Sequence, residues 1–211
     1  MFRLTIGNKN FSSWSLRPWL ILKMIGEPFE EVIIDLRSPE SRLSLSTLTP
    51  AGKVPVLQDK QLTIWDSLAI CEYLAECFPG SHLWPSDPAA RAIARSMAAE
   101  MHSSFSTLRG QMPMDVASSR ESPASTPELA ADIARIVHLW EEQRSHYHLA
   151  GPFLFGSFSI ADAFFAPVAF RFKTYGVVLP EASQGWVDHM LSLPAMQEWA
   201  EASAEEIRAG A

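Results

Sequence analysis

The N-terminal part of the chain alternates between strand-like and helix-like patterns of hydrophobic and polar positions. Residues 2–6 alternate apolar and polar, which predicts a short strand. Apolar residues recur at helical spacing over residues 15–25, with Pro18 in the first turn and Gly26 directly after the last, which predicts a helix. Residues 29–36 predict a second strand. Because a strand, a helix and a strand follow one another so closely, we expect a βαβ unit with parallel strands.

A second group of elements follows before residue 80. The patterns predict a weak helix over 38–48, strands over 54–57 and 62–64, and an amphipathic helix over 66–78. Turn residues between the two strands indicate a hairpin, and the Pro-Gly pair that follows the last helix ends it. The order of elements is therefore βαβ followed by ββα.

The character of the chain changes after a Pro- and Gly-containing linker at residues 79–88. Strand signals vanish, and helical patterns cover residues 89–110, 128–148, 159–175, 183–191 and 194–207. A Ser- and Pro-rich stretch over 115–127 predicts an irregular connection. We therefore expect an α/β domain over residues 1–79 and an all-α helical bundle domain over 88–211.

Composition and charge narrow the classes of function. Hydrophobic residues make up 47% and charged residues 19% of the chain, as in an ordinary globular protein. The net charge of −7 argues against a nucleic-acid partner, which requires a basic surface. Residues 1–78 hold 8 Lys and Arg against 9 Asp and Glu, so this near-neutral part is the better place for an anionic ligand.

The two cysteines and the apolar runs exclude other classes. Cys71 and Cys77 lie six residues apart in a helical pattern, with no CxxC partner and no His at metal spacing. We interpret both as buried helical cysteines and expect no metal site and a reducing, cytoplasmic environment. We expect no signal peptide, because the N-terminus lacks a long apolar h-region. We expect no membrane partner, because no apolar run reaches the roughly 20 residues that a membrane helix needs.

Three short motifs carry most of the functional information. Residues 52–57 read Gly-Lys-Val-Pro-Val-Leu, residues 66–70 read Asp-Ser-Leu-Ala-Ile, and residues 158–162 read Phe-Ser-Ile-Ala-Asp. The third motif is a variant of the capping box, in which Ser159 and Asp162 close the N-terminus of a helix, so its role is structural. The second opens a helix, where free N–H groups favour an anion.

These motifs and the order of elements resemble the cytosolic glutathione transferases, over essentially the whole chain. That resemblance implies an N-terminal thioredoxin-like domain and a helical C-terminal domain. The opening Phe-Ser-Ser-Trp-Ser-Leu-Arg at residues 11–17 is most similar to the serine-type classes, theta and zeta. The resemblance also implies glutathione as co-substrate and a homodimer.

The resemblance implies which residues bind glutathione. Pro55 would be cis, which presents the Val54 backbone to the cysteine of glutathione like an added strand. Ser67 would bind the γ-glutamyl carboxylate and Asp66 the γ-glutamyl ammonium, while Lys53 could meet the glycine carboxylate. The alternatives are a trans edge-strand proline, an Asp-Ser pair that only caps a helix, and a solvated lysine. Weaker candidates for the role of Lys53 are Arg37 and Arg42.

Activation of the glutathione thiol requires a lower pKa than the roughly 8.5 of free cysteine. A hydroxyl that donates to the sulfur favours the thiolate. By match to the serine-type motif, Ser12 is the first candidate and Ser13 the second, whereas Ser15 is expected to cap the helix. No tyrosine precedes Tyr73 and no cysteine precedes Cys71, which excludes the tyrosine-type and cysteine-type classes and disulfide exchange.

The second substrate is expected to bind between the two domains. Candidate pocket residues are Phe11, Trp14, Met101, His102 and Phe105. Trp14 stands where the zeta class has a cysteine, which puts maleylacetoacetate isomerisation in doubt. Three functions remain open: a transferase or related peroxidase acting on a hydrophobic electrophile, a glutathione-dependent isomerase, and a non-catalytic binding module.

Overall fold

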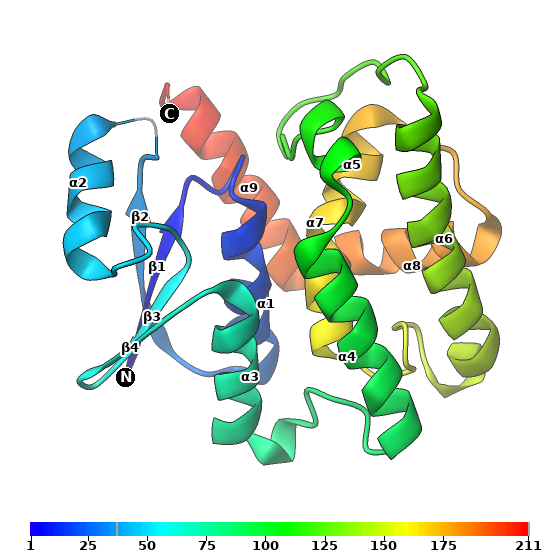
Figure 1. Ribbon diagram of the computed structural model, residues 1–211, viewed down its shortest axis with the longest axis horizontal. Coiled ribbons are helices and arrows are strands. Elements are labelled where there is room, and N and C mark those ends of the chain that lie inside the picture. Colours follow the sequence, from blue (N-terminus) through cyan, green and yellow to red (C-terminus); the bar gives the residue numbers. More distant parts are fainter. Residues whose placement is uncertain (37, 211) are drawn as a thin grey trace.

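The computed structural model describes residues 1–36 and 38–210, with side chains for all of these except 39–42 and 44. Figure 1 shows a mixed sheet with helices on both faces, joined to a larger group of helices. The strands are β1 (Phe2–Gly7), β2 (Phe29–Ile34), β3 (Val56–Asp59) and β4 (Leu62–Trp65). The α-helices are α1 (Ser13–Ile25), α2 (Pro39–Leu48), α3 (Ser67–Cys77), α4 (Pro88–Ser103), α5 (Ser106–Gln111), α6 (Pro127–Tyr147), α7 (Ile160–Tyr175), α8 (Glu181–Ser192) and α9 (Pro194–Arg208). Short 3-10 helices are η1 (Pro79–Ser81) and η2 (His148–Ala150).

The sheet has the strand order β2-β1-β3-β4. β1 pairs with β2 in parallel, as the βαβ pattern predicts, and with β3 in antiparallel. The hairpin of β3 and β4 is also confirmed. β3 begins at Val56, two residues later than expected, because Pro55 has no N–H to donate to the ladder. The cis peptide bond between Val54 and Pro55 matches the expectation from the motif.

Helices α1 and α3 lie between the sheet and the helical part, while α2 covers the other side of the sheet (Figure 1). α1 packs against both α3 and α7, so it belongs to the cores of both domains. α7 is the central helix, and every residue in it except Lys173 is buried. Its N-terminus carries the predicted capping residues, because the Ser159 N–H donates to Asp162 at 3.0 Å.

Two predictions about this part of the chain are wrong. The single helix expected over residues 89–110 is two helices, α4 and α5, separated at Phe105, which has a φ of 63°. This break places the Phe105 ring in the core, and Asp132 of α6 caps α5 through the Leu108 N–H at 2.9 Å. Cys71 is buried, as expected, but Cys77 in the last turn of α3 is exposed.

The described residues contain no helix that combines the length and the apolar character needed to cross a membrane.

Candidate functional site

A cavity of about 450 Å³ lies where the first domain meets the second. Its lining residues come from the loops before β3 and α3, from the start of α1 and from the end of α4: Trp14, Ala51, Lys53, Val54, Pro55, Trp65, Asp66, Ser67 and His102. All five residues that the sequence assigns to glutathione line this one cavity, with two of the residues assigned to the second substrate. Segments that lie far apart in sequence therefore meet at one site.

The other candidates for the second-substrate pocket lie elsewhere. Met101 and Phe105 are both buried in the core, so they support the cavity from behind and do not line it. Phe11 is 45% exposed and is not among the lining residues. Of the weaker candidates, Arg37 lies outside the described residues, and so does the side chain of Arg42.

Val54 presents a backbone that has no partner in the sheet. Its N–H and C=O form no hydrogen bond with the described residues, although it directly precedes the buried Pro55. Main-chain groups at the edge of a sheet can pair with an extended peptide. The loop thus offers one donor and one acceptor to a peptide ligand in the cavity, and Lys53 beside it offers a positive charge.

Asp66 and Ser67 form the start of α3. Asp66 has a φ of 74°, and its Oδ1 accepts from the Leu68 N–H at 2.8 Å and from the Ala69 N–H at 3.4 Å. Asp66 therefore caps the helix through Oδ1, and Oδ2 takes no part in the capping. Ser67 is 1% exposed overall, yet it lines the cavity at the positive end of the helix. An anionic group placed there would meet both the hydroxyl and the helix terminus.

His102 connects the second domain to this helix start. Its Nε2 lies 3.2 Å from Oδ2 of Asp66, and its ring meets the Trp14 ring edge-on with centroids 5.2 Å apart. The Nδ1 atom is buried and has no hydrogen-bond partner among the described residues. Burial lowers the pKa of His102 below its ordinary value, although the nearby Asp66 carboxylate acts in the opposite direction. His102 is therefore mainly neutral at neutral pH.

Residues 8–12, here called the serine loop, lead into α1. Ser12 is the N-cap residue of α1, and its Oγ lies 2.7 Å from Oγ of Ser15. The expected capping role of Ser15 is wrong, because Ser15 lies within the helix and its Oγ accepts from the Gly7 N–H at 3.1 Å. Ser13 Oγ forms no hydrogen bond within the described part of the chain. Ser12 and Ser13 are both largely buried, and neither is among the residues that line the cavity. Their neighbour Trp14 does line it.

Contacts from distant parts of the chain hold the serine loop. The Glu206 carboxylate of α9 accepts from the backbone N–H groups of Lys9 at 2.9 Å and Asn10 at 3.1 Å. The Asn10 side chain donates to Asp115 at 2.8 Å and accepts from the Ala117 N–H at 2.8 Å. Sequence reasoning missed these contacts, because each joins residues that are more than 100 positions apart.

Arg17 is a second feature that sequence reasoning missed. It is fully buried, and its guanidinium carbon lies 4.4 Å from the ring centroids of both Trp14 and Phe164. Its Nη1 donates to Ser67 Oγ at 3.4 Å. Burial lowers the pKa of Arg17 to about 9. The only signal in the sequence is a basic residue in a stretch of helix that is otherwise apolar.

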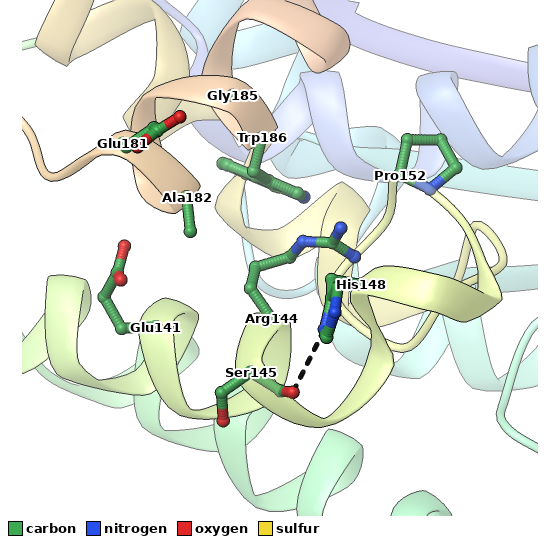
Figure 2. A pocket seen from close by; sticks show the side chains of 9 residues that line it. All are labelled: Glu141, Arg144, Ser145, His148, Pro152, Glu181, Ala182, Gly185 and Trp186. Carbon is green, nitrogen blue, oxygen red and sulfur yellow. Dashed lines mark hydrogen bonds between the residues drawn. The ribbon is translucent and has the colours of Figure 1, made fainter.

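A larger cavity, of about 720 Å³, lies between α6 and α8 (Figure 2). Two of its charged side chains, Arg144 and Glu141, already have structural partners. Arg144, in the middle of the view, donates to the carbonyls of Gly151 and Phe153, while Glu141 accepts from the backbone and hydroxyl of Ser183. Because these groups hold η2 and the start of α8 in place, we do not regard this cavity as the functional site. Among the described residues, no group of three or more His, Cys, Asp or Glu could hold a metal ion.

Known proteins resemble this chain in both of its parts. Family models match residues 11–77, as "Glutathione S-transferase, N-terminal domain", and residues 121–202, as "Glutathione S-transferase, C-terminal domain". Glutathione S-transferase F14 of Arabidopsis thaliana is 32% identical over 71% of this chain and 61% of its own length. A probable maleylacetoacetate isomerase of Caenorhabditis elegans is 34% identical over 52% of this chain and 50% of its own length. The chain thus spans between half and two thirds of these relatives.

Solved structures share the whole fold. A glutathione transferase homolog from Burkholderia, solved with bound glutathione, has a TM-score of 0.72 at 25% identity and covers 97% of this chain and 98% of its own. A glutathione S-transferase from Rhodospirillum rubrum has a TM-score of 0.73 at 22% identity, over 94% of this chain and 91% of its own. The match extends over both the α/β part and the helical part.

Proposed function

We propose, from the premise that this chain belongs to the glutathione S-transferase family, that it binds glutathione in the interdomain cavity and activates the thiol for attack on a hydrophobic electrophile. The observation that carries the proposal is the convergence of Val54, Asp66 and Ser67 on one cavity. The Burkholderia homolog with bound glutathione supports the choice of ligand.

The groups in the cavity match the groups of glutathione. The unpaired N–H and C=O of Val54 suit the backbone of the central cysteine. Ser67, at the start of α3, suits the γ-glutamyl carboxylate, and Oδ2 of Asp66 suits the ammonium beside it. Lys53 is exposed and lines the same cavity, so a salt bridge to the glycine carboxylate would contribute on the order of 1 kcal/mol or less.

For the thiol, we propose a serine of the serine-type classes as hydrogen-bond donor. Ser12 remains the first candidate, because its contact with Ser15 can prepare it for this role. If the Ser15 hydroxyl donates to Ser12 Oγ, then the Ser12 proton is left to donate to the sulfur. Such a donor stabilises the thiolate and lowers its pKa. Ser13, whose hydroxyl has no partner among the described residues, is the second candidate.

The test is a titration of the thiolate absorbance of bound glutathione. We expect the bound thiol to ionise below the roughly 8.5 of free cysteine, and Ser12→Ala to raise its pKa. Ser13→Ala is the matched control, since it removes a neighbouring hydroxyl from the same turn. A bound thiol that titrates as in free solution would contradict activation and leave a glutathione-binding module. An effect of Ser13→Ala alone would move the role to Ser13.

A glutathione-dependent isomerase is the second candidate function, because the C. elegans relative is named a probable maleylacetoacetate isomerase. Trp14 lines the cavity at the position expected to shape the second-substrate site. Parallel assays with maleylacetone and a chlorinated aromatic separate the two activities. A turnover of maleylacetone that exceeds conjugation of the aromatic would favour the isomerase.

We also propose a homodimer and a cytoplasmic location, as is usual in the family. Light scattering of the purified protein at several concentrations tests the first proposal. A molar mass near the 23.5 kDa of one chain would contradict it.

A further inference from the structure

The surroundings of Arg17 contain less negative charge than a buried guanidinium requires. The side chain is 0% exposed, and its Nε and Nη2 have no hydrogen-bond partner among the described residues. It takes part in no ion pair in the described part of the chain. Burial of an unpaired charge is costly, so a protein retains one where a partner is supplied from outside or where function needs the charge.

The charged groups near Arg17 do not balance it. Among those that act on it, Arg109 and Arg171 are cations that lower its pKa, and Asp66 is the carboxylate that opposes them. The thiol of Cys71 is neutral, because burial raises its pKa. Asp66 already caps α3 and faces His102. The interior behind the cavity is therefore positive when no ligand is bound.

Arg17 makes one polar contact among the described residues, and this contact indicates where the charge of a ligand would lie. Nη1 donates to Ser67 Oγ, and Ser67 lines the cavity at the start of α3. A hydroxyl that accepts from a guanidinium has its own proton free to donate elsewhere. The guanidinium carbon also lies 4.4 Å from the ring centroids of Trp14 and Phe164, so the two rings restrict its position beside Ser67.

We propose that Arg17 is a positioning residue for the γ-glutamyl carboxylate of glutathione, acting through Ser67. It directs the Ser67 hydroxyl proton into the cavity and supplies the positive charge that the bound carboxylate neutralises. This inference rests on the proposed glutathione site and deepens it. It gives a fully buried arginine, which touches no solvent, a role in selecting an anionic ligand group.

The test is a thermodynamic cycle in which the protein and the ligand are both changed. Calorimetry measures the affinity of the full-length wild type and of Arg17→Met for two ligands, glutathione and γ-aminobutyryl-cysteinyl-glycine, which lacks this carboxylate. Arg17→Met should weaken glutathione binding by about ten- to a hundredfold, the range for a hydrogen bond to a charged group, and should leave the analogue within about threefold. Arg17→Lys should recover part of the affinity for glutathione.

Arg171→Met is the matched control, because it removes another buried cation, which donates to the Met112 carbonyl and, within the described part of the chain, to no cavity residue. It should change the affinities for both ligands by the same factor. An equal loss for both ligands in Arg17→Met would show a purely structural role and overturn the inference.

Binding of the two ligands to wild-type protein distinguishes a failure of the proposed glutathione site from a failure of the role proposed for Arg17. If it binds neither ligand, the proposed glutathione site fails, and the role of Arg17 fails with it. If it binds both equally tightly, glutathione binding stands but carboxylate selection by Arg17 and Ser67 is refuted. This comparison remains decisive if Arg17→Met does not fold.

Discussion

Replacement of Asp162 by Ala should cause one of the largest losses of stability available to this chain. The Asp162 carboxylate is buried at the start of α7, the central helix, and it accepts four hydrogen bonds. The donors are the Leu154 N–H at 2.9 Å, the Ser159 N–H at 3.0 Å, the Ser159 hydroxyl at 2.9 Å and the Trp186 indole N–H at 2.9 Å. One side chain therefore joins the loop before α7, the helix itself and α8.

The magnitude follows from the donors that lose their acceptor. Leu154, Ser159 and Trp186 are all at most 2% exposed, so water cannot replace the carboxylate at their N–H groups. Three orphaned buried donors at roughly 1–2 kcal/mol each give a loss of about 3–6 kcal/mol. Burial raises the pKa of Asp162, so removal of the charge offsets part of this loss and favours the lower figure. Against a typical total stability of about 5–15 kcal/mol, even 3 kcal/mol is severe.

Urea unfolding followed by circular dichroism measures the effect. Asp162→Asn keeps one acceptor oxygen and should fall between wild type and Asp162→Ala, while Ser159→Ala loses a single capping contact and should cost about 1 kcal/mol. An Asp162→Ala protein within about 1 kcal/mol of wild type would refute the account of orphaned donors. If that variant is too unstable to purify, a larger loss for Ser159→Ala than for Asp162→Asn would refute it.

Four further substitutions test the site. Gly7→Ala places a Cβ 2.5 Å from Leu36 Cδ1 at the entry to the serine loop, so urea unfolding should show a loss of about 1–3 kcal/mol; no loss would mean that the loop accommodates the methyl group. Asp66→Asn removes the carboxylate that raises the pKa of His102, so an NMR titration should show a lower value than in wild type, and an unchanged value would argue against their contact. Because the folded-state pKa of His102 lies below 6.5, stability should fall as the pH drops below 6.5, and His102→Gln should lessen that slope. Glu206→Gln should weaken thiol activation by loosening the serine loop, measured as a rise in the pKa of bound glutathione, whereas an unchanged pKa would make the contact purely structural.

Local signals in the sequence predict most of the elements and the grouping of the site residues. Alternation in residues 2–6 and the βαβ order give the parallel pair of β1 and β2, because both follow from short-range patterns. The sequence could assign Val54 and Ser67 to one site because each lies in a short motif next to a strand or helix end, and both residues line one cavity. These are features that the chain specifies within a few residues.

The features that sequence reasoning missed depend on partners far along the chain. No Gly or Pro marks the break at Phe105, and the carboxylate that caps α5 comes from Asp132 in a different helix. The burial of Arg17 depends on Phe164 of α7, which covers one face of its guanidinium. Tertiary contacts of this kind override local preference, so periodicity alone does not reveal them.

The hydrogen bonds between Glu206 and the serine loop also bear on the order in which parts of the chain fold. A ribosome makes this chain from its first strand onward, and N-terminal domains generally fold first during synthesis. The first domain can therefore form its sheet early, but the amides of Lys9 and Asn10 receive their partner only after 197 and 196 further residues have been made. A chain cut before Glu206 would thus carry the proposed glutathione cavity with the amides of Lys9 and Asn10 unpaired, although Asp115 and Ala117 could already hold the Asn10 side chain.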